Sequence, residues 1–433
     1  MSSYKLIFPI IMVLVMLGSV YMLWDTRAKV KAEYDEALSQ AREYAEQDIE
    51  KYAVENYTKA LDINPTVDVY YELGKYYFDI ESYKKSLDVA ETMMDEYADN
   101  VKGYELALDV YLSKNNFRDC FELNDVYEKR SKKSEKFEKG IEKIKYEFYI
   151  EASFQGVTSF CGDVCSVMKE NSWGYRDKYG DSVTGLNFNF TGPMFDGYAP
   201  VIDKEGDAYI IDSEGSKVDN IKDVPRAVSI GMVVDGICPV YDGSSWSYYN
   251  TKDGLLFGGY DSAGAFSSEV AAVQKNGKWN LINYEGSNVI DDTFDEIFVD
   301  EKGISYRNER LFVKQNGSWY MIDAEGKKIT DEAFEDARLF ADTTYAAVKK
   351  NGKWGYIDNS GKWFIEPTYD EARSFSNGFA AVKIGDKWGF INSDKELCIE
   401  CQFDDAKEFS DNGSVFVKEG EEWQFLMLYS YNH

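Results

Sequence analysis

Histidine is almost absent from this chain, and its absence excludes several kinds of active site. The only histidine among the 433 residues is His433, the last one. Serine–histidine and cysteine–histidine nucleophile systems and histidine-ligated zinc sites are therefore excluded. No GxxxxGK(S/T) motif occurs, and no GxGxxG motif opens a helix after a strand, so no phosphate-cradling loop is predicted. We expect no catalytic residues, no metal and no cofactor, and therefore no enzyme.

Cysteines and basic residues are also scarce. Six cysteines are too few to form a disulfide scaffold in a chain of this length. Cys398 and Cys401 have CxxC spacing, but residues three apart on a strand point to opposite faces. The chain has 48 Lys and Arg against 77 Asp and Glu, a net charge of -29, which repels phosphate backbones. Nucleic acid is therefore not an expected partner.

The many acidic residues offer carboxylate pairs of the kind that glycosidases use, but their pattern favours a simpler interpretation. Asp370 and Glu371 recur at equivalent places along the chain, next to predicted turns. Such positions are typical of turn and solvated-surface residues. We therefore expect these residues to have a structural role.

One long apolar run lies at the start of the chain. Residues 4–24 carry Lys5 as their only charge, and their length is that of a helix that crosses a bilayer. We expect a single-pass transmembrane anchor that attaches the protein to a membrane, with the bulk of the chain outside the cytoplasm. The basic residues Arg27, Lys29 and Lys31 keep the cytoplasmic orientation open as the alternative.

Residues 26–147 form a predicted helical domain. They are rich in Ala, Glu, Lys, Tyr and Leu, and their apolar residues follow a spacing of three and four. A segment of two predicted helices recurs along the chain, which indicates α-hairpin repeats. Ala53, Ala60 and Pro65 stand where tetratricopeptide repeats place small residues and a closing proline. Residues 30–130 therefore resemble about three tetratricopeptide repeats.

Three residues of this domain are candidates for binding. Tyr71, Lys75 and Phe78 share one face of a predicted helix over residues 67–79. The resemblance implies that this face lines a groove that holds an extended peptide or a partner helix, so a protein or peptide partner is expected. The alternative is that Tyr71 and Phe78 pack on the next hairpin.

A tryptophan-centred motif recurs after residue 150. It is clearest in NGKWGYIDNSGK at residues 351–362 and in GDKWGFINSDKE at residues 385–396. Its tryptophans, or the residue in their place, define eight repeats, which we number 1 to 8: Trp173, Ala208, Trp246, Trp279, Trp319, Trp354, Trp388 and Trp423. We expect these tryptophans, with Gly355 and Gly389, to form the structural core of the repeats.

The Asn-Gly pair at 351–352 predicts a hairpin with a two-residue type I′ turn. In this register Val348 faces Gly355, and both faces of the ribbon are apolar, so neighbouring sheets must cover both. We expect Trp354 to fill the gap on one face and Gly355 to make room for the next sheet on the other.

A third strand that Pro367 ends completes a predicted three-stranded sheet in each repeat. The last repeat has no third strand, whereas residues 149–154 match a third strand without partners. We therefore predict that residues 149–154 pair with 423–428 and close an eight-bladed, three-stranded propeller-like ring, with an open β-solenoid as the alternative. The predicted fold class is multidomain α + β: the anchor at 4–24, the helical domain at 26–147 and an all-β domain at 149–433.

The pattern K-x-G-K-W-G-(Y/F)-I-D-x-x-G-K resembles WG-repeat proteins over residues 150–428. The copies at Trp354 and Trp388 match closely, and those at Ala208 and Trp246 depart most. This resemblance implies a β-rich repeat domain of bacterial proteins, with binding roles and no catalytic residues to transfer.

Trp363 departs from the repeat, because Asn288 and Lys328 stand at its position in other copies. It is either an exposed platform for a sugar ring or a partner, or a side chain that the adjacent repeat covers. Together, these observations predict a membrane-anchored, non-enzymatic scaffold that binds proteins. The alternative is a cell-wall protein that binds or acts on carbohydrate, which makes a glycan the second candidate partner.

Overall fold

A computed structural model describes residues 4–224 and 226–432, except the side chains of residues 4–11, 13–15, 18–21 and 23. The chain divides between Lys145 and Tyr146 into a helical unit and a β-rich unit. Each unit has hydrophobic clusters of its own.

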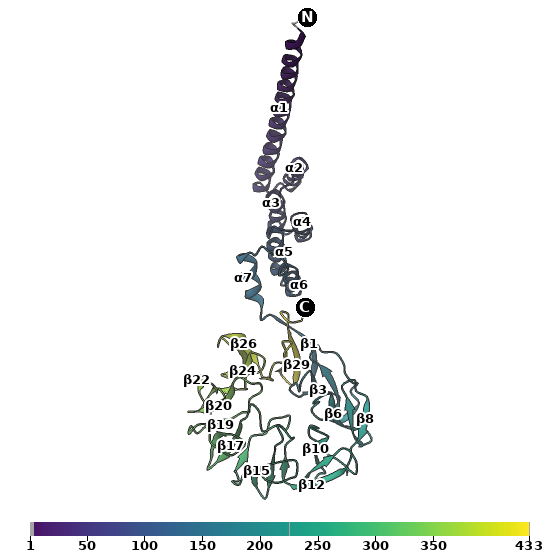
Figure 1. Ribbon diagram of the computed structural model, residues 1–433, viewed down its shortest axis with the longest axis vertical. Helices are drawn as coiled ribbons and strands as arrows, with labels where there is room; N and C mark the ends of the chain where they lie inside the picture. Colours follow the sequence, from purple (N-terminus) through teal and green to yellow (C-terminus); the bar gives the residue numbers. More distant parts are fainter. Residues whose placement is uncertain (1–3, 225, 433) are drawn as a thin grey trace. The chain divides into compact units, whose positions relative to one another are not determined.

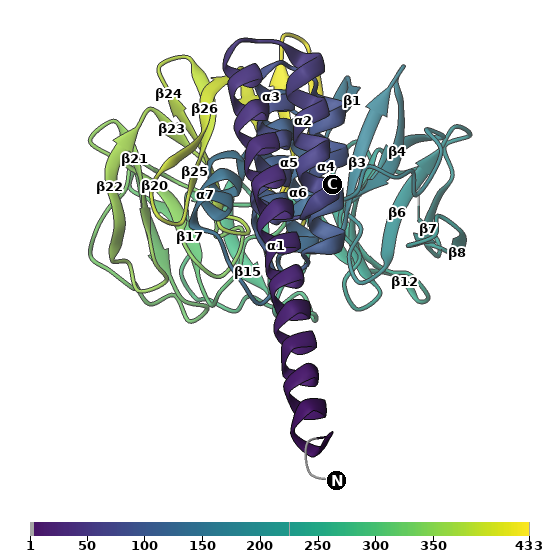
Figure 2. The same cartoon turned by 90° about the horizontal axis from the view of Figure 1, so that it is seen from above.

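The helical unit consists of consecutive helices joined by short turns (Figures 1 and 2). Neighbours in sequence pack against each other, α1 with α2, α3 with α4 and α5 with α6. Their bounds are α1 Tyr4–Glu46, α2 Glu50–Ile63, α3 Val67–Asp79, α4 Tyr83–Glu96, α5 Lys102–Ser113, α6 Phe117–Tyr127 and α7 Glu135–Ile144.

Small residues allow these helices to approach one another closely. Ala53 and Ala60 on α2 are fully buried. A side chain at Gly74 on α3 would place its Cβ 2.3 Å from a methyl carbon of Leu106 on α5, so a larger residue would force the Leu106 side chain to move. Thr66 accepts a hydrogen bond from the backbone N–H of Val69 and caps the start of α3. Local capping and close packing thus define the helical hairpins.

The predicted transmembrane anchor and the single-pass membrane localisation are corrected by the structure. Across the residues whose side chains are described, no helix has the length and apolar character needed to cross a bilayer. Most side chains of the predicted span, residues 4–24, lie outside this description. The span belongs to α1, which continues without a break to Glu46 and packs on α2.

The β-rich unit contains seven antiparallel sheets within the described residues. Two-residue strands open many of the repeats, and longer strands form the hairpins. In chain order the strands are β1 Phe148–Phe154, β2 Gly156–Val157, β3 Val164–Lys169, β4 Ser172–Asp177, β5 Phe188–Thr191, β6 Tyr198–Asp203, β7 Ala208–Asp212, β8 Lys217–Asn220, β9 Ser229–Ile230, β10 Ile237–Tyr241, β11 Trp246–Asn250, β12 Gly254–Tyr260, β13 Ser262–Ala263, β14 Ala271–Lys275, β15 Lys278–Ile282, β16 Glu296–Ile297, β17 Leu311–Gln315, β18 Ser318–Ile322, β19 Asp336–Ala337, β20 Ala346–Lys350, β21 Lys353–Ile357, β22 Trp363–Tyr369, β23 Glu371–Ala372, β24 Phe379–Ile384, β25 Lys387–Asn392, β26 Leu397–Phe403, β27 Asp405–Ala406, β28 Ser414–Glu419 and β29 Glu422–Leu428.

The sheets follow one another around a ring, and the two ends of the unit share one sheet (Figure 1). Strand β1 pairs antiparallel with β29, with Tyr149 opposite Met427 and Phe154 opposite Trp423. The predicted pairing of residues 149–154 with 423–428 is confirmed. An open solenoid is excluded, because it would hold these strands at opposite ends.

The prediction of eight three-stranded blades is wrong in two respects. First, several sheets have a fourth strand, because a two-residue strand such as Glu371–Ala372 pairs with the next long strand. Second, repeats 1 and 2 form one sheet of seven strands, β2 to β8. Strand β5 runs continuously from its contact with Trp173 into its pairing with β6, so nothing separates the two repeats. The fold is propeller-like with seven sheets.

The hairpin at the Asn-Gly pair has the predicted register. Val348 pairs with Gly355, and Asn351 and Gly352 both have positive φ, as a type I′ turn requires. The reason for the glycine differs from the prediction. A Cβ on Gly355 would lie 2.5 Å from the carbonyl oxygen of Ile365, which belongs to the third strand of the same sheet. The glycine thus makes room for its own sheet.

The third strand β22 bulges where it passes Gly355, because the pairing register shifts between Trp354 and Tyr356. The strand continues through Pro367 to Tyr369, so the prediction that Pro367 ends it is wrong. A proline fits there because β22 is an edge strand with a bulge.

Candidate binding site at the centre of the ring

Each repeat places one residue at an equivalent point, which we call the inner position. Its backbone N–H donates to a carbonyl oxygen of the next long strand, at 2.8 to 3.0 Å in all eight repeats. This shared bond establishes that the repeats are structurally equivalent, although their inner side chains differ. The inner residues of repeats 1 to 8 are Thr158, Gly192, Gly231, Gly264, Phe298, Arg338, Arg373 and Lys407.

In repeats 6 to 8 the inner residue is a cation that lies over the tryptophan of the same repeat. The charged group is 5.0 to 5.4 Å from the ring centroid, within the range of a cation–π contact. In repeat 5, Phe298 meets Trp319 edge to face at 6.4 Å. The three cation pairs are Arg338 with Trp354, Arg373 with Trp388 and Lys407 with Trp423.

The two arginines also connect successive repeats. Arg338 Nε donates to the carbonyl oxygen of Ala372 at 2.9 Å, and its Nη2 lies 3.1 Å from Glu371 Oε1. Arg373 makes the same pair of contacts with the next repeat, to the carbonyl oxygen of Ala406 and to the carboxylate of Asp405. Burial, followed by repulsion from Arg373, lowers the pKa of Arg338. These guanidinium groups therefore serve as repeat-to-repeat links.

A loop at residues 299–303 brings distant repeats together at the centre. Glu301 accepts hydrogen bonds from the backbone N–H of Ser159 and from Lys407 Nζ, while the Ser159 hydroxyl donates to Glu408. The backbone N–H of Ala265 donates to the carbonyl oxygen of Gly303 at 2.7 Å. Repeats 1, 4, 5 and 8 therefore meet through this one loop, which we call the central loop.

The pKa values of two carboxyl groups at the centre of the ring, Glu408 and Asp300, are shifted in opposite directions. Burial would raise the pKa of Glu408, but Arg373, Lys302, the hydrogen bond from Ser159 and Lys407 together hold it well below its usual range. Burial raises the pKa of Asp300, even though its carboxylate accepts hydrogen bonds from backbone N–H groups of the central loop.

Two cavities flank the central loop, and residues of this loop line both. The glycine-side cavity, of about 340 Å³, is lined by Thr158, Gly231, Trp173 and Trp246 of the early repeats. The arginine-side cavity, of about 280 Å³, is lined by Arg307, Arg338, Arg373 and Glu408. Asp300, Glu301 and Lys302 border both. No three Asp, Glu, His or Cys side chains among the described residues form a metal site.

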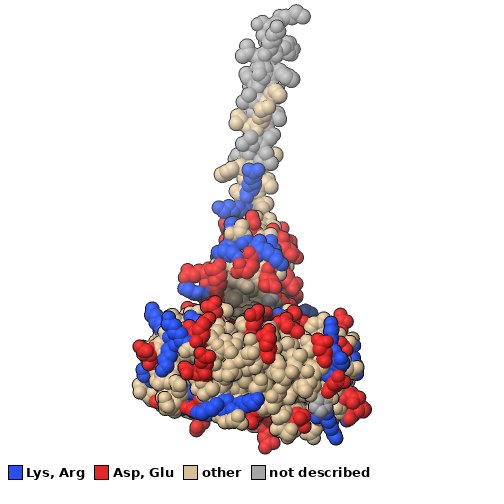
Figure 3. Space-filling view, turned by 60° about the horizontal axis from the view of Figure 1, so that its bottom comes forward, with Lys and Arg blue, Asp and Glu red and all other residues tan. Residues whose placement is uncertain are grey.

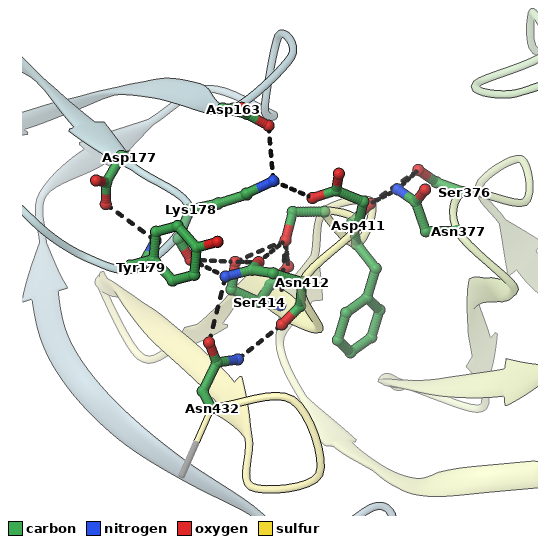
Figure 4. Close-up of polar contacts among 12 residues, drawn as sticks. Asp163, Asp177, Lys178, Tyr179, Ser376, Asn377, Asp411, Asn412, Ser414 and Asn432 are labelled. Carbon is green, nitrogen blue, oxygen red and sulfur yellow. Dashed lines mark hydrogen bonds and ion pairs between the residues drawn. The ribbon is translucent and has the colours of Figure 1, made fainter.

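A second polar cluster joins the two ends of the ring, as Figure 4 shows. Lys178 Nζ of repeat 1 lies 2.9 Å from Asp163 and 2.9 Å from Asp411 of repeat 8. Asn412 and Ser414 both donate to the carbonyl oxygen of Lys178. Hydrogen bonds to Asp411 and Asp163 raise the pKa of Lys178. This cluster reinforces the pairing of β1 with β29.

The structure places the three candidates of the helical unit together. Tyr71, Lys75 and Phe78 lie half-buried on α3, and Phe78 meets Tyr83 of α4 edge to face at 5.8 Å. Tyr83 belongs to the same hairpin as Phe78, so the alternative of packing on the next hairpin also stays a prediction. Their role in binding remains a prediction.

Trp363 is half-buried and packs edge to face on Phe334 of the preceding repeat, at 6.0 Å. Trp363 thus contacts the adjacent repeat and keeps part of its ring exposed, so its role in binding remains a prediction. Cys165 and Cys238 are buried. On the face of the β-rich unit shown in Figure 3, uncharged side chains form a broad expanse bordered by charged ones.

The sequence interpretation missed the inner position. Its residues lie between the third strand of one repeat and the hairpin of the next, beside the short strands, where the sequence predicted no element. The signal becomes visible when the repeats are aligned: glycine recurs at this position in repeats 2 to 4, and arginine or lysine in repeats 6 to 8.

Comparison with known proteins identifies the repeat. The family profile described as "WG containing repeat" matches residues 246–279, 321–354, 354–388 and 388–423. The chain matches no curated protein.

Similar solved structures include BamB from Moraxella catarrhalis, with 11% identity, a TM-score of 0.41, and coverage of 65% of this chain and 99% of that one. Another is Hsv2 from Kluyveromyces lactis, with 7% identity, a TM-score of 0.37, and coverage of 61% and 93%. Because both scores are low, the fold rests on the strand pairings of this chain. The matched residues, 246–279 and 321–423, thus consist of WG-containing repeats within the β-rich unit.

Proposed function

We propose that the protein is a non-catalytic scaffold whose helical unit holds a segment of a partner protein. The observation that best supports this is the α3 face formed by Tyr71, Lys75 and Phe78. Lys102 Nζ lies 5.3 Å from the Tyr71 ring centroid, and Lys75 Nζ lies 4.2 Å from that of Phe78. Aromatic rings flanked by cations suit a partner segment that carries both apolar and acidic side chains.

The arrangement of the helices supports this use of the face. We infer that α2 to α7 are tetratricopeptide-like hairpins, since buried alanines and Gly74 occupy the points of closest helix contact. Stacked hairpins of this kind present a continuous surface built from successive helices.

The thiols support a role without nucleophilic catalysis. Burial raises the pKa of both Cys120 and Cys238 to about 12. Burial also raises the pKa of Cys401, which is only half-buried. A thiol with a raised pKa carries little thiolate at neutral pH and is a weak nucleophile.

Site-specific photo-crosslinking in the source cells tests the proposal. A benzoylphenylalanine at Tyr71 should capture one defined protein, and Phe78→Ala should reduce that capture. The same group at Tyr52, an exposed residue of α2, is the matched control and should not capture it. Equal capture from both positions, or capture that Phe78→Ala leaves unchanged, would contradict the proposal.

A further inference from the structure

The tryptophans of the ring differ in what lies over them. In repeats 6 to 8 a cation from the inner position lies over each ring, as described above. In repeats 1 and 3 the inner residues are Thr158 and Gly231, neither of which carries a charge. Among the described residues, no Lys or Arg lies over Trp173 or Trp246 as Arg373 lies over Trp388. These two tryptophans therefore lack a cation, although the backbone around them has the same hydrogen bond as in repeats 6 to 8.

Trp173 and Trp246 both line the glycine-side cavity, together with Thr158 and Gly231. Tyr241 stacks on Trp246 at 5.3 Å and accounts for one face of its ring. The space that the arginines occupy in the late repeats is therefore open in the early ones. At about 340 Å³, the cavity reaches the size at which protein cavities hold small organic ligands.

The charged residues around this cavity favour a positive ligand. Asp300 and Glu301 of the central loop line it, and Lys302 is its one basic lining residue among those described. Arg307, Arg338 and Arg373 face the arginine-side cavity, beyond the central loop. Two carboxylates and two tryptophans that lack a cation therefore border the same space. Glu301 already pairs with Lys407, and Asp300 lies 3.7 Å from Arg307, so a bound cation would share these carboxylates while it makes cation–π contacts.

We propose that the glycine-side cavity binds a small organic cation whose guanidinium or ammonium group lies over Trp173 or Trp246 and faces the carboxylates of the central loop. The ligand takes the place that Arg338 and Arg373 occupy in their own repeats. This site lies in the β-rich unit and is independent of the partner-binding face on α3.

Fluorine NMR of the full chain labelled with 5-fluorotryptophan tests this proposal. The chain has nine tryptophans, and single Trp→Phe variants assign the signals. N-butylguanidinium is the probe, and N-butylurea is its neutral counterpart of nearly equal shape. We expect the guanidinium to shift the Trp173 and Trp246 signals saturably and to leave those of Trp354 and Trp388 in place. The urea should shift none of them.

The second part of the test uses a variant whose own side chain occupies the proposed ligand site. Thr158→Arg should bring a guanidinium over Trp173, as Arg373 does over Trp388, and should weaken probe binding roughly tenfold or more. Thr158→Ala removes the same hydroxyl without adding a cation and should weaken probe binding far less than Thr158→Arg does. Equal shifts of all tryptophan signals, equal binding of the urea, or unchanged binding by Thr158→Arg would overturn the proposal.

Discussion

The early repeats carry Thr158 and three glycines at the inner position, whereas repeats 6 to 8 carry Arg338, Arg373 and Lys407. The backbone bond at this position is the same in both halves of the ring. The ring is therefore held by backbone hydrogen bonds that all repeats share. The size of the inner side chain determines whether the space beside each tryptophan is filled. In repeats 6 to 8 the inner side chains bind to other repeats, whereas in repeats 1 to 4 the small inner residues leave a cavity.

The largest expected effect comes from disrupting the pairing of β1 with β29, which closes the ring and which we call the seam. Leu426 is fully buried in β29, between β1 and β28. Leu426→Pro should lower the free energy of unfolding by more than about 4 kcal/mol, because a proline removes a ladder bond and disturbs the core. Urea denaturation followed by tryptophan fluorescence measures this.

Cys401→Pro is the matched control for the seam variant. Cys401 occupies the bulge position beside Gly389 that Pro367 occupies beside Gly355. This substitution should cost little, since β26 is an edge strand. A loss of stability equal to that of Leu426→Pro would show that the seam is no more sensitive than the rest of the ring.

The next largest effect is expected at the inner position, where a late repeat can be compared with an early one. Arg373→Ala should cost about 3 kcal/mol, because it leaves Asp405, Glu408 and a carbonyl oxygen without a largely buried cation. Thr158→Ala at the equivalent position should cost only about 1 kcal/mol, through loss of its hydrogen bond from the backbone N–H of Ser166. Equal costs in denaturant titrations would remove the distinction between the halves.

The glycine of the motif should respond alike in both halves. A Cβ at Gly174 would lie 2.5 Å from the carbonyl oxygen of Gly185, the distance found between Gly355 and Ile365. Gly174→Ala and Gly355→Ala should each cost about 2 kcal/mol, because the backbone that passes over each glycine must move: the loop at Gly185 in one case and strand β22 in the other. Thermal unfolding of both variants checks this. If the two costs differ by more than about 1 kcal/mol, the early and late repeats differ in their sheets as well as at the inner position.

The smallest effect is a weak acid sensitivity of the late repeats. Hydrogen bonds from Lys353 and from the backbone N–H of Gly385 lower the pKa of Asp370, and Lys387 and Gly420 do the same for Asp404. A carboxylate with a lowered pKa stabilises the fold above its unfolded pKa of about 3.9, and this contribution is lost as pH falls through the folded pKa.

The melting temperature should therefore fall below about pH 4, and less steeply in the Asp370→Asn, Asp404→Asn double variant. Asp386→Asn, at an exposed hairpin tip, is the control and should follow the wild type. Identical acid profiles for all three proteins would contradict this assignment.

Some features of the fold could be predicted because their causes are local. The Asn-Gly pair at 351–352 accommodates two positive φ values, and the turn then sets the register of the whole hairpin. The ring closure could be predicted because the missing third strand of repeat 8 has its counterpart at residues 149–154.

Other features depend on contacts that a single repeat does not reveal. A two-residue strand such as β23 has too few residues to show alternation, so the fourth strand was missed. The sequence marks Gly355 as small but does not indicate which backbone passes over it. In repeat 4, Asn280 takes the place of this glycine, and its amide donates to the carbonyl oxygens of Ile290 and Asp292. The central loop was missed because its partners lie in repeats far apart in sequence.

The shared sheet of β1 and β29 also bears on how the protein is made. During synthesis β1 leaves the ribosome before every other strand of the ring, and its partner leaves last. An unpaired strand edge is a template for pairing with another chain. A chain whose translation stops before residue 422 would keep this edge open and could accept β29 from a finished neighbour. Synthesis of β29 thus decides whether the ring can close.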